Sequence, residues 1–261
     1  MAPPAVVVCF RPEPSCDRAA QLARLLAALQ ELAPDTRVYV IEQSDDGRRF
    51  NRGALLNYGT RCALDDGAMG VVLHDCDLLP SDALAKYYRD ADALQDAPVH
   101  IAAEYERYRS AEFFGGIVGL SRAHALRTNG FPNRFWGWGG EDQALRARCL
   151  RLGLLPVRAR GSITDMEVGA DGAPLTVSAK LQRLRDAGSK CPLKREHLSA
   201  EGRLWHTDGL NAVQQRSAAV LSRRETPGAH VHLVVQLPDA EGALPSAPTD
   251  CVQKTDGKIP A

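Results

Sequence analysis

The chain has 261 residues, of which 44% are hydrophobic and 25% charged, so it is long enough to bury one sizeable core. Lys plus Arg and Asp plus Glu both number 32, which gives a formal net charge of zero, and this balance disfavours a nucleic-acid-binding domain. No apolar run reaches the roughly 18 residues of a membrane-spanning helix, and the first residues lack the basic start of a signal peptide. We expect a protein that acts where it is made, or a fragment that has lost an anchor.

The first part of the chain alternates short apolar runs with segments of helical periodicity. Five elements are predicted in chain order: a strand at 5–9, a helix at 18–32, a strand at 37–41, a helix at 51–64 and a strand at 70–74. This βαβαβ order predicts an α/β fold, with a mainly parallel sheet and helices on both faces. Ligands of such sheets bind beyond the carboxyl ends of the strands, and Asp75 and Asp77 follow the third strand at such an end.

The second part is less regular. The expected elements are an apolar segment at 113–120, a short helix from Arg122, a helix at 142–152 and a final strand at 229–237. The stretch 161–201 is polar and weakly periodic, which predicts a mobile loop with one amphipathic helix at about 177–185. The chain from 238 is rich in Pro, Ala and Asp and is expected to be disordered.

Seven cysteines are present, an odd number without a CxxC pair. A zinc knuckle is therefore disfavoured. Most of these cysteines are interpreted as small buried hydrophobic residues, and the sequence leaves room for one long-range disulfide.

The tetrapeptide His74-Asp75-Cys76-Asp77 places two carboxylates one residue apart after a buried strand. An uncompensated buried carboxylate is costly, whereas a divalent cation compensates it and can bridge diphosphate oxygens. Mg²⁺ and Mn²⁺ are the natural choices for oxygen ligands. A lone DxD is, however, more often an ordinary polar turn or helix cap.

The segment WGWGGED, residues 136–142, holds two of the three tryptophans and three glycines. Its glycines leave the backbone free to approach a ligand. Glu141 and Asp142 fall at a helix start, where the helix dipole favours the ionised carboxylate. Carboxylates beside flat aromatic rings suit a sugar, since its ring packs on the aromatics and its hydroxyls bond to the carboxylates. The alternative is a tight loop with a buried tryptophan and an acid-capped helix.

Two further segments fit a nucleotide. In FNRGALLN, residues 50–57, Phe50 and Arg52 could hold a base and a phosphate, and after the first strand Phe10-Arg11 could contact a diphosphate. Taken alone, the first segment is better interpreted as an ordinary helix start and the second as a solvated arginine.

Together, and in this order, these segments resemble the beta-1,4-galactosyltransferase family. The matching pieces are Cys9-Phe10-Arg11, FNRGALLN, DCDLLP, FGGI, NGFPNRFWGWGGED and DGLN. The resemblance covers residues 5 to 237, and the long NGFPNRFWGWGGED motif is highly specific. The details HDCDLLP and NRFWGWG look most like the xylosylprotein branch, which builds the proteoglycan linker.

The resemblance implies a GT-A-type, Rossmann-like nucleotide-sugar transferase fold. It implies inverting transfer of galactose from UDP-galactose to a sugar hydroxyl in beta-1,4 linkage, with Mn²⁺ as cofactor and Mg²⁺ as the alternative. The partners are a UDP-sugar donor and a glycan or glycoconjugate acceptor, and the usual compartment is the Golgi lumen. We expect one catalytic domain over 1–237, with a donor-binding half at about 1–100, an acceptor and catalytic half at about 101–237, and a tail at 238–261.

The family's roles carry over to matching positions. Asp77 resembles the metal ligand, Asp75 supports the donor, and Asp142 resembles the catalytic base. The positions matched to the donor nucleotide are Phe10, Arg11, Phe50 and Arg52. The positions matched to the sugars are Phe113, Gly115, Gly116, Trp138, Gly139, Gly140 and Glu141.

Two departures from the family pattern matter. Where the family has a metal-binding histidine segment, this chain has Asp165 and Glu167, which are predicted to complete the metal site with Asp77 because carboxylates can replace imidazoles around a hard cation. A merely polar loop with His206 as the ligand is the alternative. Phe113 replaces a tyrosine that touches the donor sugar in the family, which keeps UDP-N-acetylgalactosamine or another UDP-hexose open as the donor. A non-catalytic sugar- or nucleotide-binding homologue is the other alternative.

Overall fold

The computed structural model describes residues 2–13, 17–105, 107, 110–169, 172–213, 218–226 and 230–238. All of the tail predicted from 238 except its first residue lies outside these ranges. The five described cysteines, at 9, 62, 76, 149 and 191, form no disulfide with one another. None of the described helices combines the length and apolar character that a membrane span requires.

The centre of the fold is a parallel sheet built from the predicted apolar runs. Strands β1 (Ala5–Phe10), β2 (Val38–Gln43) and β3 (Gly70–Asp75) are parallel, with β1 in the middle, and β10 (His230–Gln236) pairs with β2 in the same direction. Since β1 and β3 are in register from Ala5↔Val71 to Cys9↔Asp75, the segments that follow them lie side by side. The predicted parallel core is confirmed.

The sheet has eight strands in the order β7-β5-β6-β3-β1-β2-β10-β9. The outer strands are β5 (Val99–His100), β6 (Ile117–Ser121), β7 (Val157–Arg158) and β9 (Ala219–Thr226). Strand β6 runs antiparallel to β3, and β9 runs antiparallel to β10, so the sheet is mixed. Strand β9 was not predicted, because its residues are almost all exposed and carry no apolar alternation.

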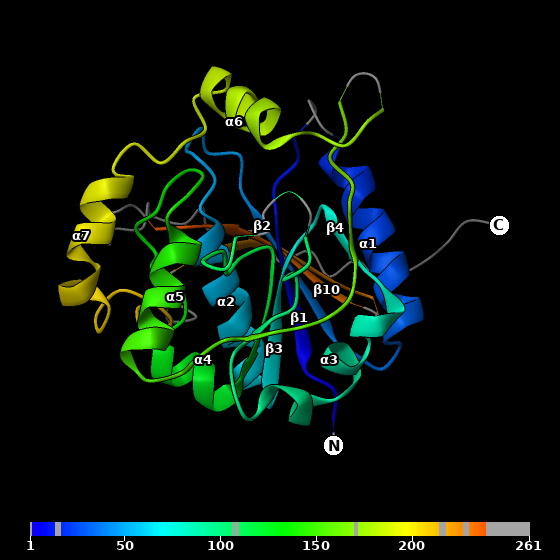
Figure 1. Ribbon diagram of the computed structural model, residues 1–261. Helices are drawn as coiled ribbons and strands as arrows, with labels where there is room; N and C mark the ends of the chain where they lie inside the picture. The colour runs from blue at the N-terminus through cyan, green and yellow to red at the C-terminus, as the bar shows by residue number, and fades with distance from the viewer. Residues whose placement is uncertain are drawn as a thin grey trace.

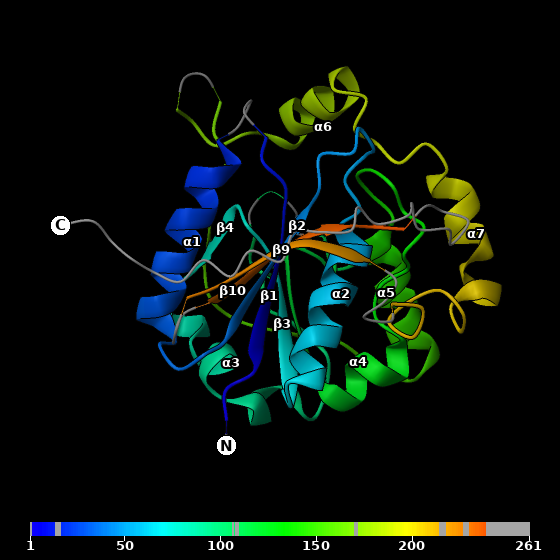
Figure 2. The same cartoon turned by 180° about the vertical axis from the view of Figure 1, so that it is seen from behind.

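Helices cover both faces of the sheet (Figures 1 and 2). Among the described residues, the α-helices are α1 (Arg18–Leu32), α2 (Arg52–Asp65), α3 (Lys86–Arg89), α4 (Arg122–Thr128), α5 (Glu141–Arg151), α6 (Val177–Asp186) and α7 (Lys194–Leu204). Short 3-10 helices span Asp82–Leu84 and Ala91–Leu94. Side chains alternate between the faces along β1. Val6 and Val8 therefore join the core with α1 on one face, and Val7 and Cys9 join the core with α2 on the other.

The stretch 161–201 is more regular than its sequence predicts. The predicted helix is present as α6, but α7 and a short strand, β8 (Ile163–Asp165), are present as well. Strand β8 pairs antiparallel with β4 (Leu78–Pro80), with Leu78 opposite Asp165. This pairing brings residues that are about 90 positions apart in the chain next to the carboxyl end of β3. Helix α6 lies over that end of the sheet, opposite the N-terminus (Figure 1).

Candidate active site

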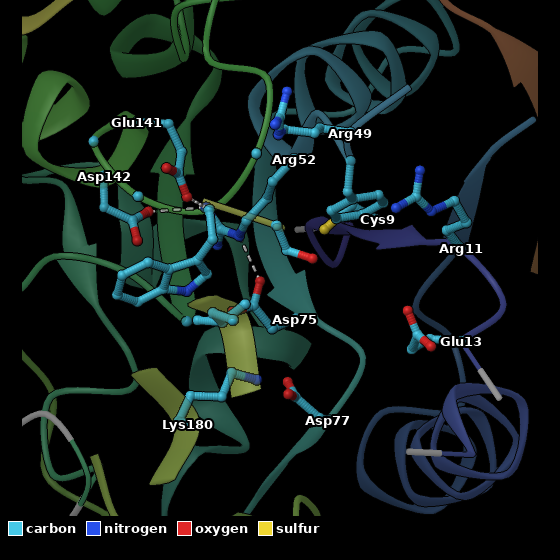
Figure 3. A pocket seen from close by; sticks show the side chains of 18 of the residues that line it. Cys9, Arg11, Glu13, Arg49, Arg52, Asp75, Asp77, Glu141, Asp142 and Lys180 are labelled. Atoms are coloured by element: carbon cyan, nitrogen blue, oxygen red, sulfur yellow. Dashed lines mark hydrogen bonds and ion pairs between the residues drawn. The ribbon is translucent and has the colours of Figure 1, made fainter. Parts of the chain in front are cut away.

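A cavity of about 1220 Å³ opens at the carboxyl ends of β1 and β3. Its walls come from the segment after β1, the residues that follow β3, the WGWGGED segment and the stretch that includes α6 (Figure 3). The predicted site residues that line it are Phe10, Arg11, Phe50, Arg52, Asp75, Asp77, Phe113, Gly116, Trp138, Gly139, Gly140, Glu141, Asp142 and Glu167. A cavity of this size accommodates a nucleotide-sized ligand together with a sugar.

Arg52 organises one side of this cavity. It is the first residue of α2, where the side chain of Asn51 caps the helix by accepting from the backbone N–H of Ala54 at 3.0 Å. Its guanidinium donates to Asp75 at 2.6 Å and to Asp142 at 2.8 Å, and lies 3.8 Å from Glu141 (Figure 3). One cation therefore gathers three carboxylates from two separate elements. We call Arg52, Asp75, Glu141 and Asp142 the Arg52 cluster.

The Arg52 cluster has three carboxylates and one cation. The pKa values of two of these carboxyl groups are raised. Burial raises the pKa of Asp142 to about 8, against the opposing charge of Arg52 and with the help of Glu141 and Asp75. Burial also raises the pKa of Asp75, again opposed by Arg52. A carboxyl group with a pKa near neutrality can accept a proton from a hydroxyl and hold it.

Two polar atoms of the Arg52 cluster have no hydrogen-bond partner among the described residues. They are Nη2 of Arg52 and Oε2 of Glu141, and both are buried. Unpaired buried polar atoms are costly, and at a site they indicate groups that a ligand satisfies. A phosphate or hydroxyl can accept from this Arg52 nitrogen, and a sugar hydroxyl can donate to Glu141.

Gly115 sets the position of Asp142, although it is absent from the cavity wall. A Cβ at Gly115 would lie 2.2 Å from Oδ2 of Asp142, which is far inside contact distance. Only a residue without a side chain leaves room for this carboxylate. The structure therefore gives the first glycine of FGGI a steric role behind the predicted base.

The tryptophan-glycine loop, residues 136–140, is held in place by backbone hydrogen bonds to two other segments. Gly137, Gly139 and Gly140 have φ of 103°, 101° and 110°, a region that favours glycine. The backbone N–H of Gly137 donates to the carbonyl of Phe50 at 2.9 Å, and that of Trp138 donates to the carbonyl of Ser189 at 2.8 Å. Trp138 remains 38% exposed on the cavity wall. Its indole is thus available to a ligand, while its backbone is fixed.

A buried ion-pair network involves Arg134, which stands two residues before this loop in the chain. Arg148, which is fully buried, donates to Glu201 at 2.6 Å, and Arg134 forms ion pairs with both Glu201 and Asp208. Asp208, the first residue of the DGLN motif, also accepts from the backbone N–H of Asn133 at 2.9 Å. The structure therefore gives the DGLN motif a scaffolding role that its sequence did not reveal.

The other predicted nucleotide residues, Phe10, Arg11 and Phe50, also line the cavity. Phe10 is nearly buried and packs edge-on against His232, so that it presents little surface to the cavity. Arg11 donates to the carbonyl of Arg48 at 2.7 Å, and its guanidinium lies 5.5 Å from the ring centre of Phe50. These aromatic and cationic groups offer a surface for a base and a diphosphate.

Asp77 belongs to a second cluster, in which every carboxylate has a cationic partner. Arg18 donates to Asp77 and to Glu167, each at 2.6 Å. Glu167 also pairs with Lys180 and with Arg107. Asp165 pairs with Arg107 and accepts from the hydroxyl of Tyr105 at 2.7 Å. We call these six charged residues, Arg18, Asp77, Arg107, Asp165, Glu167 and Lys180, the Asp77 cluster.

Burial opposes ionisation in the Asp77 cluster, but its cations prevail at two of the carboxyls. They hold the pKa of Asp77 at about 2, chiefly through Arg18 and Lys180. The pKa of Glu167 is also lowered, mainly by Lys180 and Arg18. At Asp165 burial prevails, and the pKa is raised.

The predicted metal ligands Asp77, Asp165 and Glu167 are neighbours in space. The backbone N–H of Met166 donates to the carbonyl of Asp77 at 2.8 Å, which holds the two segments together. Their side chains offer only oxygen donors, which suit Mn²⁺ or Mg²⁺. Among the described residues, however, no three or more His, Cys, Asp or Glu side chains converge as a preformed metal site. These donors fit a hard cation in chemistry, and the assignment of the ligands stays a prediction.

His206, the alternative ligand, lies elsewhere. It is exposed, stacks on Trp205 with ring centres 3.9 Å apart, and does not line the cavity. The structure therefore favours the carboxylate segment over His206. Sequence reasoning missed Arg18, Arg107 and Lys180, which stand far apart in the chain and form no local motif.

A mixed, largely parallel sheet with a nucleotide-sized cavity at the carboxyl ends of its strands, bordered there by a DxD segment, defines a GT-A-type glycosyltransferase fold. Two family models match the chain: the N-terminal region of glycosyl transferase group 7 over residues 3–90, and the N-terminal domain of galactosyltransferase over residues 97–168. The chain belongs to the beta-1,4-galactosyltransferase family, as its motifs predicted.

Two curated relatives illustrate the match. The chain is 31% identical to beta-1,4-galactosyltransferase 4 of Mus musculus over 205 residues, which is 76% of this chain and 54% of the relative. It is 38% identical to beta-1,4-galactosyltransferase 6 of Mus musculus over 144 residues, which is 53% of this chain and 36% of the relative. The chain thus spans about half the length or less of these relatives.

Solved structures confirm the predicted fold class. The catalytic domain of Drosophila beta-1,4-galactosyltransferase 7, in complex with xylobiose, matches with a TM-score of 0.69 and 27% identity, over 91% of this chain and 94% of that one. A mutant of the same enzyme, in complex with manganese, UDP-Gal and xylobiose, matches with a TM-score of 0.65 and 27% identity, over 89% of this chain and 94% of that one.

Proposed function

We propose that this protein is an inverting, metal-dependent galactosyltransferase that moves galactose from UDP-galactose to a sugar hydroxyl in beta-1,4 linkage. The observation that carries this proposal is the Arg52 cluster, which places a proton-accepting carboxyl, Asp142, beside Glu141 and an exposed Trp138 in one cavity. Family membership, and a structural relative seen with manganese and UDP-Gal, support the same donor and cofactor.

The binding roles follow from where the side chains lie. Phe50 and Arg11 border the region for the base and diphosphate, and Arg52 offers its unpaired nitrogen to the donor. Glu141 accepts from a sugar hydroxyl through its unpaired oxygen, and Trp138 packs on a sugar ring. Holding both sugars in one cavity lowers the barrier by proximity.

The reaction is a single in-line displacement. Asp142 takes the proton of the acceptor hydroxyl. The hydroxyl oxygen forms a bond to the anomeric carbon from the face opposite the diphosphate. The bond between that carbon and the phosphate oxygen breaks, and its electron pair leaves with UDP. Because one bond forms on the face opposite the one that breaks, the anomeric configuration inverts.

A bound divalent cation, Mn²⁺ or else Mg²⁺, supplies Lewis-acid neutralisation of the charge that grows on the departing diphosphate. The residues that would hold it are Asp77 and Glu167, with Asp165 beside them. Arg52 adds a fixed positive charge to the cavity wall, where it pairs with Asp75.

A donor-by-acceptor screen with Mn²⁺ tests this proposal. UDP-galactose, UDP-N-acetylgalactosamine and UDP-glucose are each offered with xylosides and N-acetylglucosaminides, and the product linkage is read by NMR. Xylosides are included because a structural relative binds xylobiose and the HDCDLLP and NRFWGWG details resemble the xylosylprotein branch. We expect a beta-1,4-galactoside. No transfer from any donor, or an alpha-linked product, contradicts the proposal.

Phe113 favours a second candidate, transfer of a different UDP-hexose on the same scaffold. Its ring lines the cavity and packs edge-on against His100, with ring centres 5.3 Å apart, and it has no hydroxyl to offer a donor sugar. Phe113→Tyr tests this role: a shift in donor preference toward UDP-galactose indicates that Phe113 sets donor choice. An unchanged preference removes it from that role.

A further inference from the structure

Arg18 holds a defined position between two acidic side chains of the Asp77 cluster. Its Nη1 lies 2.6 Å from Oδ2 of Asp77, and its Nη2 lies 2.6 Å from Oε1 of Glu167. The same guanidinium donates to Oε1 of Gln21 at 3.0 Å, and Gln21 in turn donates to the carbonyl of Met166 at 3.1 Å. Arg18 is thus fixed from three sides at the start of α1, and it lines the cavity.

The carboxylates that Arg18 bridges are two of the three predicted metal ligands. A divalent cation on Asp77 and Glu167 needs the same oxygens, at bond lengths of about 2.0–2.1 Å for an ion of the size of Mg²⁺. The guanidinium occupies the space between these oxygens, so the two cations exclude one another. Among the described residues, Arg18 is the ion-pair partner of Asp77, whereas Glu167 keeps Lys180 and Arg107.

We propose that Arg18 is an internal counter-cation that occupies the place of the divalent cation between Asp77 and Glu167 and leaves it when the cation binds. This inference rests on the metal dependence in the proposed function. An uncompensated buried carboxylate is costly, so Arg18, at 2.6 Å from Asp77, compensates its charge in the metal-free protein. The free energy needed to break these two ion pairs makes metal binding weaker than it would be without Arg18.

The displaced guanidinium has a further consequence. Since Arg18 lines the cavity, it stays near the region where the diphosphate of a nucleotide is expected to lie. A diphosphate offers it new anionic partners with good geometry for a guanidinium. The nucleotide therefore offsets the cost of displacing Arg18, and by linkage Mn²⁺ and UDP strengthen each other's binding.

The test is Mn²⁺ binding by the full chain, measured by electron paramagnetic resonance of free Mn²⁺ with and without UDP. The variants are Arg18→Gln and Arg18→Lys. The matched control is Arg24→Gln, which removes the same charge from an exposed position on α1. Thermal unfolding of each variant checks that it is folded.

We expect Arg18→Gln to bind Mn²⁺ alone about tenfold more tightly than wild type, because the competing internal cation is gone. The factor by which UDP tightens Mn²⁺ binding is expected to be smaller in this variant than in wild type. Arg18→Lys, which keeps the charge but cannot bridge both carboxylates with a planar fork, is expected to lie between them. Arg24→Gln is expected to match wild type.

Equal or weaker Mn²⁺ binding by Arg18→Gln overturns the inference, and so does an absence of Mn²⁺ binding in every protein. Transfer by wild type is measured separately. If galactose is transferred but Arg18→Gln binds Mn²⁺ like wild type, only the inference about Arg18 is wrong. If no donor sugar is transferred while Arg18→Gln binds Mn²⁺ more tightly, the inference stands and the proposed activity is wrong.

Discussion

The Arg52 cluster and the Asp77 cluster lie in the same cavity and use the same residue types, yet their charges balance differently. In the first, one arginine serves three carboxylates, and the pKa values of Asp75 and Asp142 are raised. In the second, three cations serve three carboxylates, and the pKa of Asp77 is held at about 2. Asp75 and Asp77 are separated by one residue, but the pKa of Asp75 is raised whereas that of Asp77 is lowered.

This difference assigns different chemistry to each cluster. A carboxyl whose pKa lies near neutral pH can, in its ionised form, take a proton from a substrate, so the Arg52 cluster suits the proposed general base. A carboxylate that stays ionised can bind a divalent cation once an internal cation such as Arg18 moves away, so the Asp77 cluster is proposed to bind the metal. The ratio of cations to carboxylates around each group, rather than its residue type, separates the two roles.

The largest effect is expected from removing the divalent cation that the Asp77 cluster is proposed to hold. Exhaustive EDTA treatment should abolish transfer, because the Lewis acid that neutralises the charge on the leaving diphosphate is then gone, and Mn²⁺ should restore it. The initial rate of UDP release is the measurement. Transfer that continues after EDTA shows that the cations of the cavity suffice.

The next effect concerns the proposed base of the Arg52 cluster. Asp142→Asn keeps the shape of the side chain but cannot take a proton, so the transfer rate should fall by about 10²- to 10⁴-fold. Calorimetric titration should show UDP binding nearly unchanged, because the proposed role of Asp142 is to contact the acceptor hydroxyl and not the nucleotide. A near wild-type rate in this variant would remove Asp142 from the mechanism.

Gly115→Ala tests whether the position of Asp142 matters as well as its chemistry. The new methyl group would lie 2.2 Å from the carboxylate and must displace it. A displacement of about 1 Å can cost about 10²-fold in kcat, so a loss of roughly that size is expected. Gly202→Ala is the control, since its methyl would approach only the flexible end of Arg151, at 3.2 Å. Equal activity in both variants would contradict the steric role of Gly115.

A smaller effect is expected from individual ligands of the Asp77 cluster. Glu167→Gln should weaken Mn²⁺ binding, and Asp165→Asn should weaken it less, because Asp165 faces Arg107 and Tyr105. His206→Ala should leave it unchanged. Metal titrations of the three variants distinguish these cases. If only His206→Ala weakens binding, the carboxylate substitution is wrong, and if none does, Asp77 and the diphosphate hold the cation.

The smallest effect is a shift in pH dependence. Since Asp142 acts in its ionised form and its pKa is about 8, kcat/KM should rise with pH and level off above that value. Glu141 raises this pKa, so Glu141→Gln should move the rising limb to lower pH even where it also weakens sugar binding. A rate profile that is flat through this range would assign the proton transfer to another group.

Local sequence patterns predicted much of this molecule. The apolar runs that form β1, β2 and β3 and the periodic segments that form α1 and α2 have strong signals, because each is buried over a whole face. Strand β9 and helix α7 were missed because they are mostly exposed and their residues are largely polar.

The candidate site likewise contains residues that the sequence predicted and residues that it did not. Motif residues such as Arg52, Asp75 and Asp142 were predicted because each motif is contiguous in the chain, and the structure brings these three together. The pairing of Arg18 with Asp77 and Glu167 spans separations of 59 and 149 positions, which no local pattern encodes. Long-range ion pairs of this kind become visible only when the fold is known.

Strand β10 has a consequence for how the chain is made. It inserts between β2 and β9, and His232 on β10 contacts Glu42 on β2 across 190 positions of sequence. During synthesis, one edge of β2 therefore stays unpaired until β10 has left the ribosome. Unpaired strand edges are sites of aggregation. A nascent chain stalled or cleaved before His230 would keep its nucleotide-side motifs but expose that edge, so chaperone dependence should peak late in translation.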